Sequence, residues 1–257
     1  MKKDFLSVAA IFLTICLFTG CDNNEPSSGI ETVVNNLNYE LNSSDFTATL
    51  TGPVSSQISV VNIPSEITYK KNTYTVTAIG SGAFQGTSLT KVEIPNTIKT
   101  IGNGAFNSCH SLTSIRIPSS VTSIGCLVVD HCTNLTNLTI EDGNTTLSWD
   151  TSAGLDNMRY IKIENIYLGR NLTTSLCYQP TKTLTVGKYV KKVSLTTNFS
   201  AFNLDIKCYP TTPPELSTPS VIEAYKVRNF KLYVPSGSIN AYKDNVEWGK
   251  FANIYGF

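Results

Sequence analysis

A repeat with a step of 22 or 23 positions runs from Val76 to Leu147 and limits the folds that the chain can adopt. Apolar residues and glycines return at equivalent places in three successive copies. The equivalent positions are Ile79-Gly80, Ile101-Gly102 and Ile124-Gly125; Ala83-Phe84, Ala105-Phe106 and Val128-Val129; and the triplets Leu89, Val92, Ile94, then Leu112, Ile115, Ile117, then Leu135, Leu138, Ile140. One unit of this length cannot bury its apolar side chains alone, so the copies must stack and share a continuous core. The repeat therefore predicts a solenoid, without the single compact core in which an active-site cleft would be sought.

Each copy contains a short predicted strand. In the second copy, Ile115 and Ile117 alternate with Ser114 and Arg116, so the first pair points into the core and the second pair points to solvent. Pro118 ends this strand. The pattern Leu-x-x-Ile-x-Ile is typical of a leucine-rich repeat.

The strand pattern continues after the third copy, although the loops lose their Gly-Ala-Phe pattern. Adding 23 to the positions of the third strand predicts a fourth strand ending at Ile163, and adding 23 again predicts a fifth ending at Val186. A further unit would include Leu204 and Ile206. We therefore expect repeats over residues 76–206, with about five stacked strands and irregular connections from about residue 145.

Both flanks of the repeats differ in pattern from them. Residues 37–75 contain short β-type runs separated by turn residues, which predicts an antiparallel β cap. Residues 207–257 contain several prolines, a predicted strand at Lys231–Val234 and a predicted helix at Ser238–Lys243. The residues expected to close this end of the core are Trp248, Phe251, Ile254 and Tyr255. The predicted fold is thus mainly β, a leucine-rich-repeat solenoid with an N-terminal β cap and a C-terminal strand-helix cap.

Several segments resemble the BspA-like leucine-rich repeat family. They are Ile-Pro-Ser-Ser-Val-Thr-Ser-Ile-Gly at 117–125, Ile101-Gly102-x-x-Ala105-Phe106, Leu112-Thr113-Ser114-Ile115, the stretch 74–84, and the C-terminal stretches 211–214, 232–237 and 241–243. The resemblance covers about residues 39–257 and is weak between Thr145 and Thr183. It implies a surface-exposed or secreted protein that binds other macromolecules, host extracellular-matrix proteins among them in some members, and that does no chemistry. The family defines no universal binding motif, so it assigns no functional residue.

The first 20 residues have the pattern of a lipoprotein signal peptide. Lys2 and Lys3 precede an apolar run, and Leu17-Phe18-Thr19-Gly20-Cys21 resembles a bacterial lipobox, in which the cysteine is acylated after cleavage. The alternative is an ordinary secretory signal that ends near an unrelated cysteine. The apolar run is shorter than the roughly 20 residues that a spanning helix needs, so we expect membrane attachment through lipid on Cys21 only.

The residues that follow the signal predict a flexible tether and a cellular location. Residues 21–36 are rich in Asn, Ser, Pro and Gly, which predicts a flexible tether. The acidic stretch Asp22-Asn23-Asn24-Glu25 resembles the surface-export signal of Bacteroides-type lipoproteins. This resemblance implies a lipid-anchored protein of the bacterial outer membrane that is displayed on the cell surface.

Charge and motifs narrow the possible functions. The formal net charge is +1, which gives no electrostatic attraction to nucleic acid or to an anionic membrane surface. The sequence contains no phosphate-binding loop, no G-x-S-x-G motif and no H-E-x-x-H motif. The chain has only two histidines, so few residues could act as the base in Ser-His or Cys-His catalysis. We therefore expect no enzyme activity and no cofactor.

The cysteines that remain after the signal leave two alternatives open beside simple burial. They are Cys109, Cys126, Cys132, Cys177 and Cys208. Cys109 and Cys132 occupy one repeat position, where a small buried residue is typical, but neighbouring strands about 5 Å apart also permit a disulfide. His110 and His131 complete a nominal zinc set with them. One histidine follows its cysteine and the other precedes it, so we expect the side chains to diverge and to bind no metal.

The exposed side of the strands is the predicted binding face. It comprises Lys91, Glu93, Ser114, Arg116, Asn137, Thr139, Tyr160, Lys162, Thr183 and Thr185. Protein-binding hot spots favour Tyr and Arg, so Arg116, Tyr160 and Lys162 are the candidate ligand-binding residues. The alternative is a solvated face with cross-strand Thr pairs.

The sequence therefore predicts a non-enzymatic binding or adhesion module for host or other extracellular proteins. One alternative is a glycan-binding lipoprotein associated with polysaccharide uptake, which would be favoured if Trp149, Tyr160, Tyr167 and Tyr178 gathered on one surface. The other is a structural protein that associates with copies of itself, which large apolar patches at the caps would favour.

Overall fold

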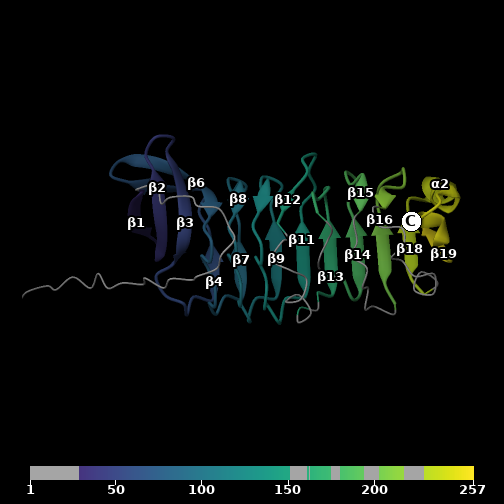
Figure 1. Cartoon of the computed structure of the whole chain (residues 1–257), viewed down its shortest axis with the longest axis horizontal. Helices are drawn as coiled ribbons and strands as arrows, with labels where there is room; N and C mark the ends of the chain where they lie inside the picture. Colours follow the sequence, from purple (N-terminus) through teal and green to yellow (C-terminus); the bar gives the residue numbers. More distant parts are fainter. Residues whose placement is uncertain (1–28, 151–160, 162, 175–179, 194–202, 217–228) are drawn as a thin grey trace, which may run out of the picture.

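Two layers of short strands run along an elongated solenoid (Figure 1). The computed structural model describes residues 29–150, 161, 163–174, 180–193, 203–216 and 229–257. Cys21, Tyr160, Lys162, Cys177 and Tyr178 lie outside the described residues. The predicted mainly β solenoid is confirmed, because one core of buried side chains extends through all of the described segments.

The first layer is a parallel sheet, called here the repeat sheet. Its seven strands follow the order of the chain, and each pairs in register with the next. They are β9 (Ser114–Ile117), β11 (Asn137–Ile140), β13 (Asn165–Leu168), β14 (Thr183–Val186), β16 (Asp205–Cys208), β18 (Lys231–Val234) and β19 (Asn253–Gly256). The parallel pair β4 (Val60–Asn62) and β7 (Lys91–Glu93) continues this layer beside β9 (Figure 1).

The second layer lies on the other side of the core. Its main path is β1 (Ile30–Val34), β2 (Leu37–Asn42), β3 (Thr47–Pro53), β6 (Asn72–Ile79), β8 (Thr100–Ile101), β10 (Ser123–Ile124) and β12 (Ser148–Trp149). Strand β5 (Glu66–Tyr69) pairs with β6, and β15 (Lys192–Val193) pairs with β17 (Glu215–Leu216). The two-residue strands β8 and β10 contain the isoleucines of the Ile-Gly pairs, so the repeat supplies one strand to each layer.

The core is built from columns of equivalent side chains between the layers. Alternate strand residues point inward, and Ile115, Leu138, Ile166, Leu184 and Ile206 are all almost fully buried. Phe84 and Phe106 form another column, with ring centroids 5.4 Å apart and an interplanar angle of 2°. Burying one such side chain stabilises the fold by about 1.5–3 kcal/mol. The stacking predicted from the repeat therefore supplies the stability that no single unit could provide.

The N-terminal cap differs from its prediction in two respects. Strand β1 lies inside residues 21–36, where the sequence predicted a tether, because Ile30 to Val34 pair with β2, in which apolar and polar residues alternate. The cap is also not wholly antiparallel: β1, β2 and β3 are antiparallel to one another, but β3 pairs in parallel with β6. Lys70 and Lys71 both adopt positive φ in the tight turn that joins the antiparallel strands β5 and β6.

The fourth strand of the predicted ladder is misplaced by the rule of adding 23. The structure pairs Asn137 with Asn165, a step of 28, and Asn165 with Thr183, a step of 18. These two steps together equal two repeats of 23, so the prediction of the fifth strand is nevertheless confirmed. At this place in the ladder the residue after the strand can have no side chain, because a Cβ on Gly169 would clash with the backbone nitrogen of Asp142. Gly169 meets this requirement for β13, whereas Glu164 would follow a strand that ends at Ile163.

The C-terminal cap contains the predicted strand and helix, and one strand more. Helix α2 (Ile239–Asp244) follows the 3-10 turn η2 (Ser236–Ser238), and η3 (Trp248–Lys250) precedes β19. Trp248 and Phe251 are buried as expected, and Tyr242 of α2 joins them. The prediction that Tyr255 closes the core is wrong, because β19 extends the repeat sheet and directs Tyr255 outward, 45% exposed.

Candidate functional site

Two columns of side chains pave the outer face of the repeat sheet. The first column, in strand order, is Ser114, Asn137, Asn165, Thr183, Asp205, Lys231 and Asn253. The second column is Arg116, Thr139, Tyr167, Thr185, Lys207, Tyr233 and Tyr255. Arg116, Thr183 and Thr185 therefore lie on the predicted face, but Asn165 and Tyr167 take the places that were predicted for Tyr160 and Lys162. The repeated pattern polar-apolar-polar-apolar-Gly at 165–169 and 183–187 is the signal that would have identified them.

Arg116 forms an ion pair with the carboxylate of Glu141, which follows the next strand. The arginine side chain is 70% exposed, whereas that of Glu141 is 19% exposed. Glu141 also accepts a hydrogen bond from the backbone nitrogen of Ser119 at 3.1 Å. An exposed pair of this kind adds little stability, about 0–1 kcal/mol. Its effect is to hold the guanidinium over the sheet, where it remains accessible.

Tyr167 donates a hydrogen bond to Asp142 on the same face, with 2.9 Å between the hydroxyl oxygen and Oδ2. Burial, together with the Asp142 carboxylate, raises the pKa of Tyr167 to about 12, so the hydroxyl stays protonated near neutral pH. Gly187 makes room for this pair, because a Cβ there would clash with Oδ1 of Asp142. The tyrosine is thus held in place beside Asp142.

An aromatic platform, defined as Tyr209, Tyr233, Tyr255 and Phe257, covers the end of this face. Tyr233 and Tyr255 are neighbours in register on β18 and β19, with ring centroids 5.4 Å apart. The rings of Tyr209 and Phe257 are 5.1 Å apart, although 48 positions separate these residues in the chain (209 to 257). Sequence reasoning missed the platform because it depends on β19, which was not predicted.

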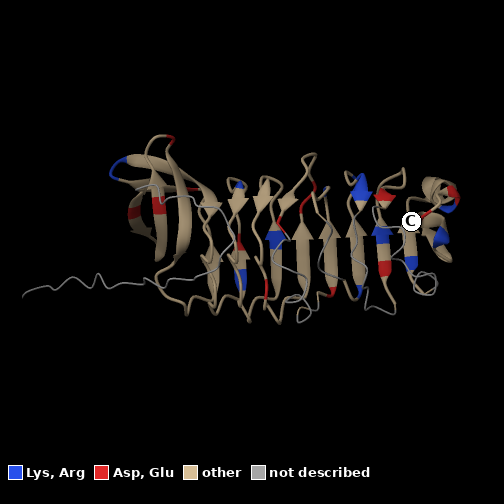
Figure 2. Ribbon diagram, in the orientation of Figure 1, with Lys and Arg blue, Asp and Glu red and all other residues tan. Residues whose placement is uncertain are grey.

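Charges of both signs alternate along the molecule (Figure 2). Ion pairs such as Lys91 with Glu93 and Lys182 with Glu164 neutralise charges locally on the repeat sheet. Over the described residues no single-sign stripe follows the strands (Figure 2). The arrangement therefore offers no continuous basic track for a phosphate backbone.

The tyrosines and the tryptophan named for a glycan site do not form the expected group. Trp149 is buried in β12 of the second layer, 3% exposed, whereas Tyr167 lies on the outer face of the repeat sheet. Tyr160 and Tyr178 lie outside the described residues. The two described rings therefore belong to opposite layers and cannot act on one ligand.

Cys109, Cys132 and Cys208 are free, buried thiols, and Cys126 is buried as well. The Cys109 thiol donates to the carbonyl of Phe84 at 3.0 Å, and that of Cys132 donates to the carbonyl of Phe106 at 3.1 Å. The neighbouring Cys132 thiol lowers the pKa of Cys109, whereas the neighbouring Cys109 thiol, together with burial, raises the pKa of Cys132. Their role in the described fold is to satisfy backbone carbonyls between successive coils.

The two histidines lie at the surface, whereas the cysteines are buried. His131 faces outward and pairs through Nδ1 with Asp130 at 2.8 Å, and His110 is exposed. Within the described segments, no three His, Cys, Asp or Glu side chains come together as a metal-binding group. The geometry of these four residues does not provide the tetrahedral convergence that zinc requires.

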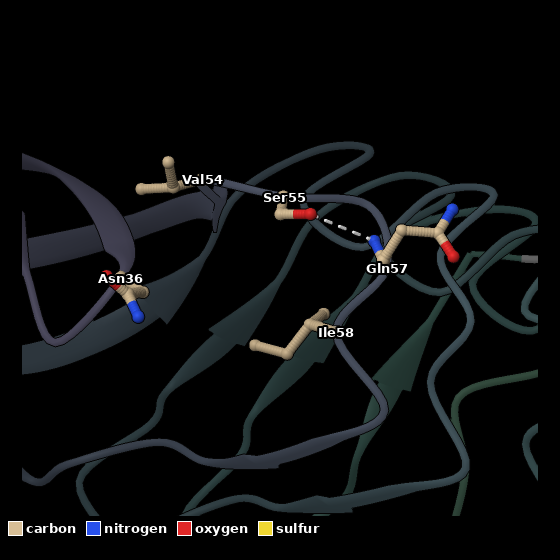
Figure 3. A pocket seen from close by; sticks show the side chains of 5 residues that line it. All are labelled: Asn36, Val54, Ser55, Gln57 and Ile58. Carbon is tan, nitrogen blue, oxygen red and sulfur yellow. Dashed lines mark hydrogen bonds between the residues drawn. The ribbon is translucent and has the colours of Figure 1, made fainter.

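A hollow of about 400 Å³ lies in the N-terminal cap, away from both columns (Figure 3). It is lined by Asn36, Val54, Ser55, Gln57 and Ile58. The Ser55 hydroxyl accepts a hydrogen bond from the backbone nitrogen of Gln57 at 3.3 Å (Figure 3). None of these side chains ionises, so the hollow supplies no acid or base for catalysis.

The chain is similar in fold to solved bacterial repeat proteins. A leucine rich cell surface protein from Faecalibacterium prausnitzii A2-165 matches with a TM-score of 0.50 and 22% identity, over 84% of this chain and 53% of that chain. A leucine-rich repeat protein from Bacteroides capillosus matches with a TM-score of 0.45 and 24% identity, over 56% of this chain and 99% of that chain. No curated protein matches the sequence.

The repeats themselves match a family. The model of the BspA type leucine rich repeat region matches residues 65–172 in six copies. These residues extend from β5 through β13 and include the Arg116 and Tyr167 positions of the outer face. The resemblance drawn from the sequence is therefore confirmed over residues 65–172, which match the model of the BspA type leucine rich repeat region.

Proposed function

We propose that this chain is a non-enzymatic binding module that recognises an extracellular protein through the outer face of its repeat sheet. The observation that supports this most directly is the placement of Arg116 and Tyr167 in one column, on either side of Thr139. Two strand spacings separate them, roughly 10 Å, so one partner can contact both. Arg and Tyr are the side chains that most often dominate protein-binding energy.

The rigid sheet favours this use of the face. Arg116 is held by Glu141, and Tyr167 is held by Asp142, so neither side chain loses much further conformational freedom when a partner binds. Ordering a free side chain would cost about 0.5–1.5 kcal/mol of binding energy. Tyr160 and Lys162, which precede β13 in the chain, remain part of the proposed site.

The binding test uses residues 22–257, which contain every described residue, and an array of extracellular-matrix proteins. We expect Arg116→Ala with Tyr167→Ala to weaken binding at least about tenfold, since hot-spot truncations cost roughly 2 kcal/mol or more. Tyr160→Ala with Lys162→Ala examines the other two proposed residues. Lys192→Ala, an exposed change on the opposite layer, is the matched control and should bind as wild type.

The proposal would be abandoned if no matrix protein bound the wild-type chain, or if the Arg116 and Tyr167 changes left every interaction intact. Circular dichroism and thermal melting of each variant must first show a folded protein. If only the Lys192→Ala change abolished binding to the array, the site would have to be placed on the second layer.

We further propose that the protein is anchored to the outer membrane by lipid on Cys21 and displayed on the cell surface. The lipobox supports this, and the similar protein from Faecalibacterium prausnitzii is described as a cell surface protein. No helix among the described segments is long and apolar enough to cross a membrane.

We expect Cys21→Ser to abolish incorporation of labelled palmitate and to release the protein from the membrane fraction, because a serine hydroxyl is not acylated in this pathway. Protease added to intact cells should degrade the wild-type protein. Cys126→Ser serves as the control and should keep both the label and the membrane attachment. Full palmitate incorporation in the Cys21→Ser protein would contradict the anchor.

A further inference from the structure

The aromatic platform leaves apolar surface in water that the protein-binding proposal does not use. Tyr209, Tyr255 and Phe257 are 46, 45 and 53% exposed, whereas comparable rings in the repeats, Phe84 and Phe106, are fully buried. Apolar surface exposed to water raises the free energy of the unbound protein, and a ligand that covers it lowers that free energy. The platform is therefore a candidate binding surface separate from Arg116 and Tyr167.

The sheet holds the rings in fixed positions. Tyr233 and Tyr255 stand in register on adjacent strands, and the backbone nitrogen of Phe257 donates to the carbonyl of Val234 at 3.0 Å. The Ser236 hydroxyl and backbone nitrogen both donate to the carbonyl of Phe257. Among the described residues, β19 pairs only with β18 and is therefore the edge strand of the repeat sheet. No strand of the described chain lies beside Tyr255 on the side away from Tyr233.

Hydrogen-bonding groups surround the rings. Lys207 is the in-register neighbour of Tyr233, and Asp205 is the neighbour of Lys231 in the adjacent column. The platform thus has an apolar floor with ammonium and carboxylate groups at its margins.

We infer that the aromatic platform binds a carbohydrate chain. A sugar ring presents C–H groups on its face and hydroxyls around its edge, so it requires a flat aromatic surface bordered by hydrogen-bond donors and acceptors. Lys207, Asp205 and Lys231 supply those partners, since ammonium groups donate and carboxylates accept. The open outer side of Tyr255 allows a chain to continue beyond the last strand.

The composition favours carbohydrate over a protein partner at this place. Protein interfaces are enriched in aromatic residues, Arg and Met, and of these the platform has only the aromatic rings, while Lys and Asp, which protein interfaces disfavour, border it. The exposed aliphatic side chain in this cap, Val246, lies between α2 and η3 and not on the platform strands.

The test is affinity electrophoresis of residues 22–257 in gels that contain a β-1,3-glucan, a mannan or a xylan. We expect at least one polysaccharide to retard the wild-type protein and Tyr233→Ala with Tyr255→Ala to weaken that binding about tenfold or more. Tyr255→Phe preserves the ring and should bind within about threefold of wild type. Tyr189→Ala removes a similarly exposed ring outside the platform and should leave binding unchanged.

Three results would overturn the inference: no retardation by any polysaccharide, retention of full binding in the Tyr233 and Tyr255 double variant, or equal loss in the Tyr189 control. Matrix-protein binding that the double variant alone removes would reassign the platform to a protein partner. Because Arg116 and Tyr167 lie outside the platform, their double variant should keep polysaccharide binding, and failure of the protein-binding proposal leaves this test intact.

Discussion

An Arg170→Ala variant should lose about 3–5 kcal/mol of unfolding free energy in a urea titration, because two hydrogen bonds and a large buried volume disappear together. Arg170 is fully buried, and its Nη1 and Nη2 donate to the carbonyls of Ser119 and Pro118, each at 2.9 Å. Alanine leaves both carbonyls without these donors and creates a cavity where the long side chain lay. Domains of this kind have only about 5–15 kcal/mol in total, so the variant should melt at a much lower temperature.

Arg170→Lys separates the two causes of this loss. Lysine retains the charge and most of the volume but cannot donate the two parallel hydrogen bonds of a guanidinium, so we expect an intermediate loss. Lys188→Ala, a change at an exposed side chain, should unfold with wild-type stability. If Arg170→Ala stayed within about 0.5 kcal/mol of wild type, the link between the coils at 118–119 and 170 would be unimportant for folding.

A Phe106→Ala variant should lose about 3–5 kcal/mol. Phe106 is fully buried and stacks on Phe84, so its removal leaves a void in the middle of the column that the rigid coils on both sides cannot close. The measurement is again urea unfolding, combined with hydrogen exchange of the strands on either side. We expect the protection to fall first in β8 and β9, which are the elements nearest to this coil in sequence.

Phe106→Leu is the informative comparison, because it keeps an apolar side chain and should cost about 1–2 kcal/mol. The third copy of the repeat has Val128-Val129 where the second has Ala105-Phe106, which shows that this column accepts an aliphatic residue when its neighbours fit. Exposed Phe46→Ala in the N-terminal cap is the control for loss of a phenylalanine as such. Equal stability of the Phe46 and Phe106 alanine variants would contradict the stacked-column account.

The strands of the repeats were predictable because their inward positions need apolar residues and their outward positions accept polar ones. Ile115 and Ile117 alternate with polar residues, and the same alternation returns after one repeat at Leu138 and Ile140. The prediction of the fourth strand was wrong because Ile161 and Ile163 satisfy the alternation as well as Ile166 and Leu168 do. Only the backbone contact at Gly169 distinguishes the two, and a spacing rule does not contain it.

The candidate sites were less predictable than the fold. The place of Arg116 on the outer face was predictable because it lies in a regular repeat, whereas the place of Tyr167 was given to another segment together with its strand. Arg170 has no signal in the sequence, since a buried arginine depends on the distant carbonyls of Pro118 and Ser119. Tyr233 and Tyr255 are one regular step of 22 apart, but the step of 26 from Lys207 to Tyr233 breaks the spacing, so the meeting of the four rings follows from strand pairing and not from the local sequence.

The unequal steps on the two sides of β13 have an evolutionary consequence. Asn165 and Tyr167 stay in line with the other columns although the chain before them is longer and the chain after them shorter than in a regular repeat. Insertions and deletions in the connections can therefore accumulate without moving the residues that face a ligand. Loop length and recognition are free to diverge separately among proteins built on this plan.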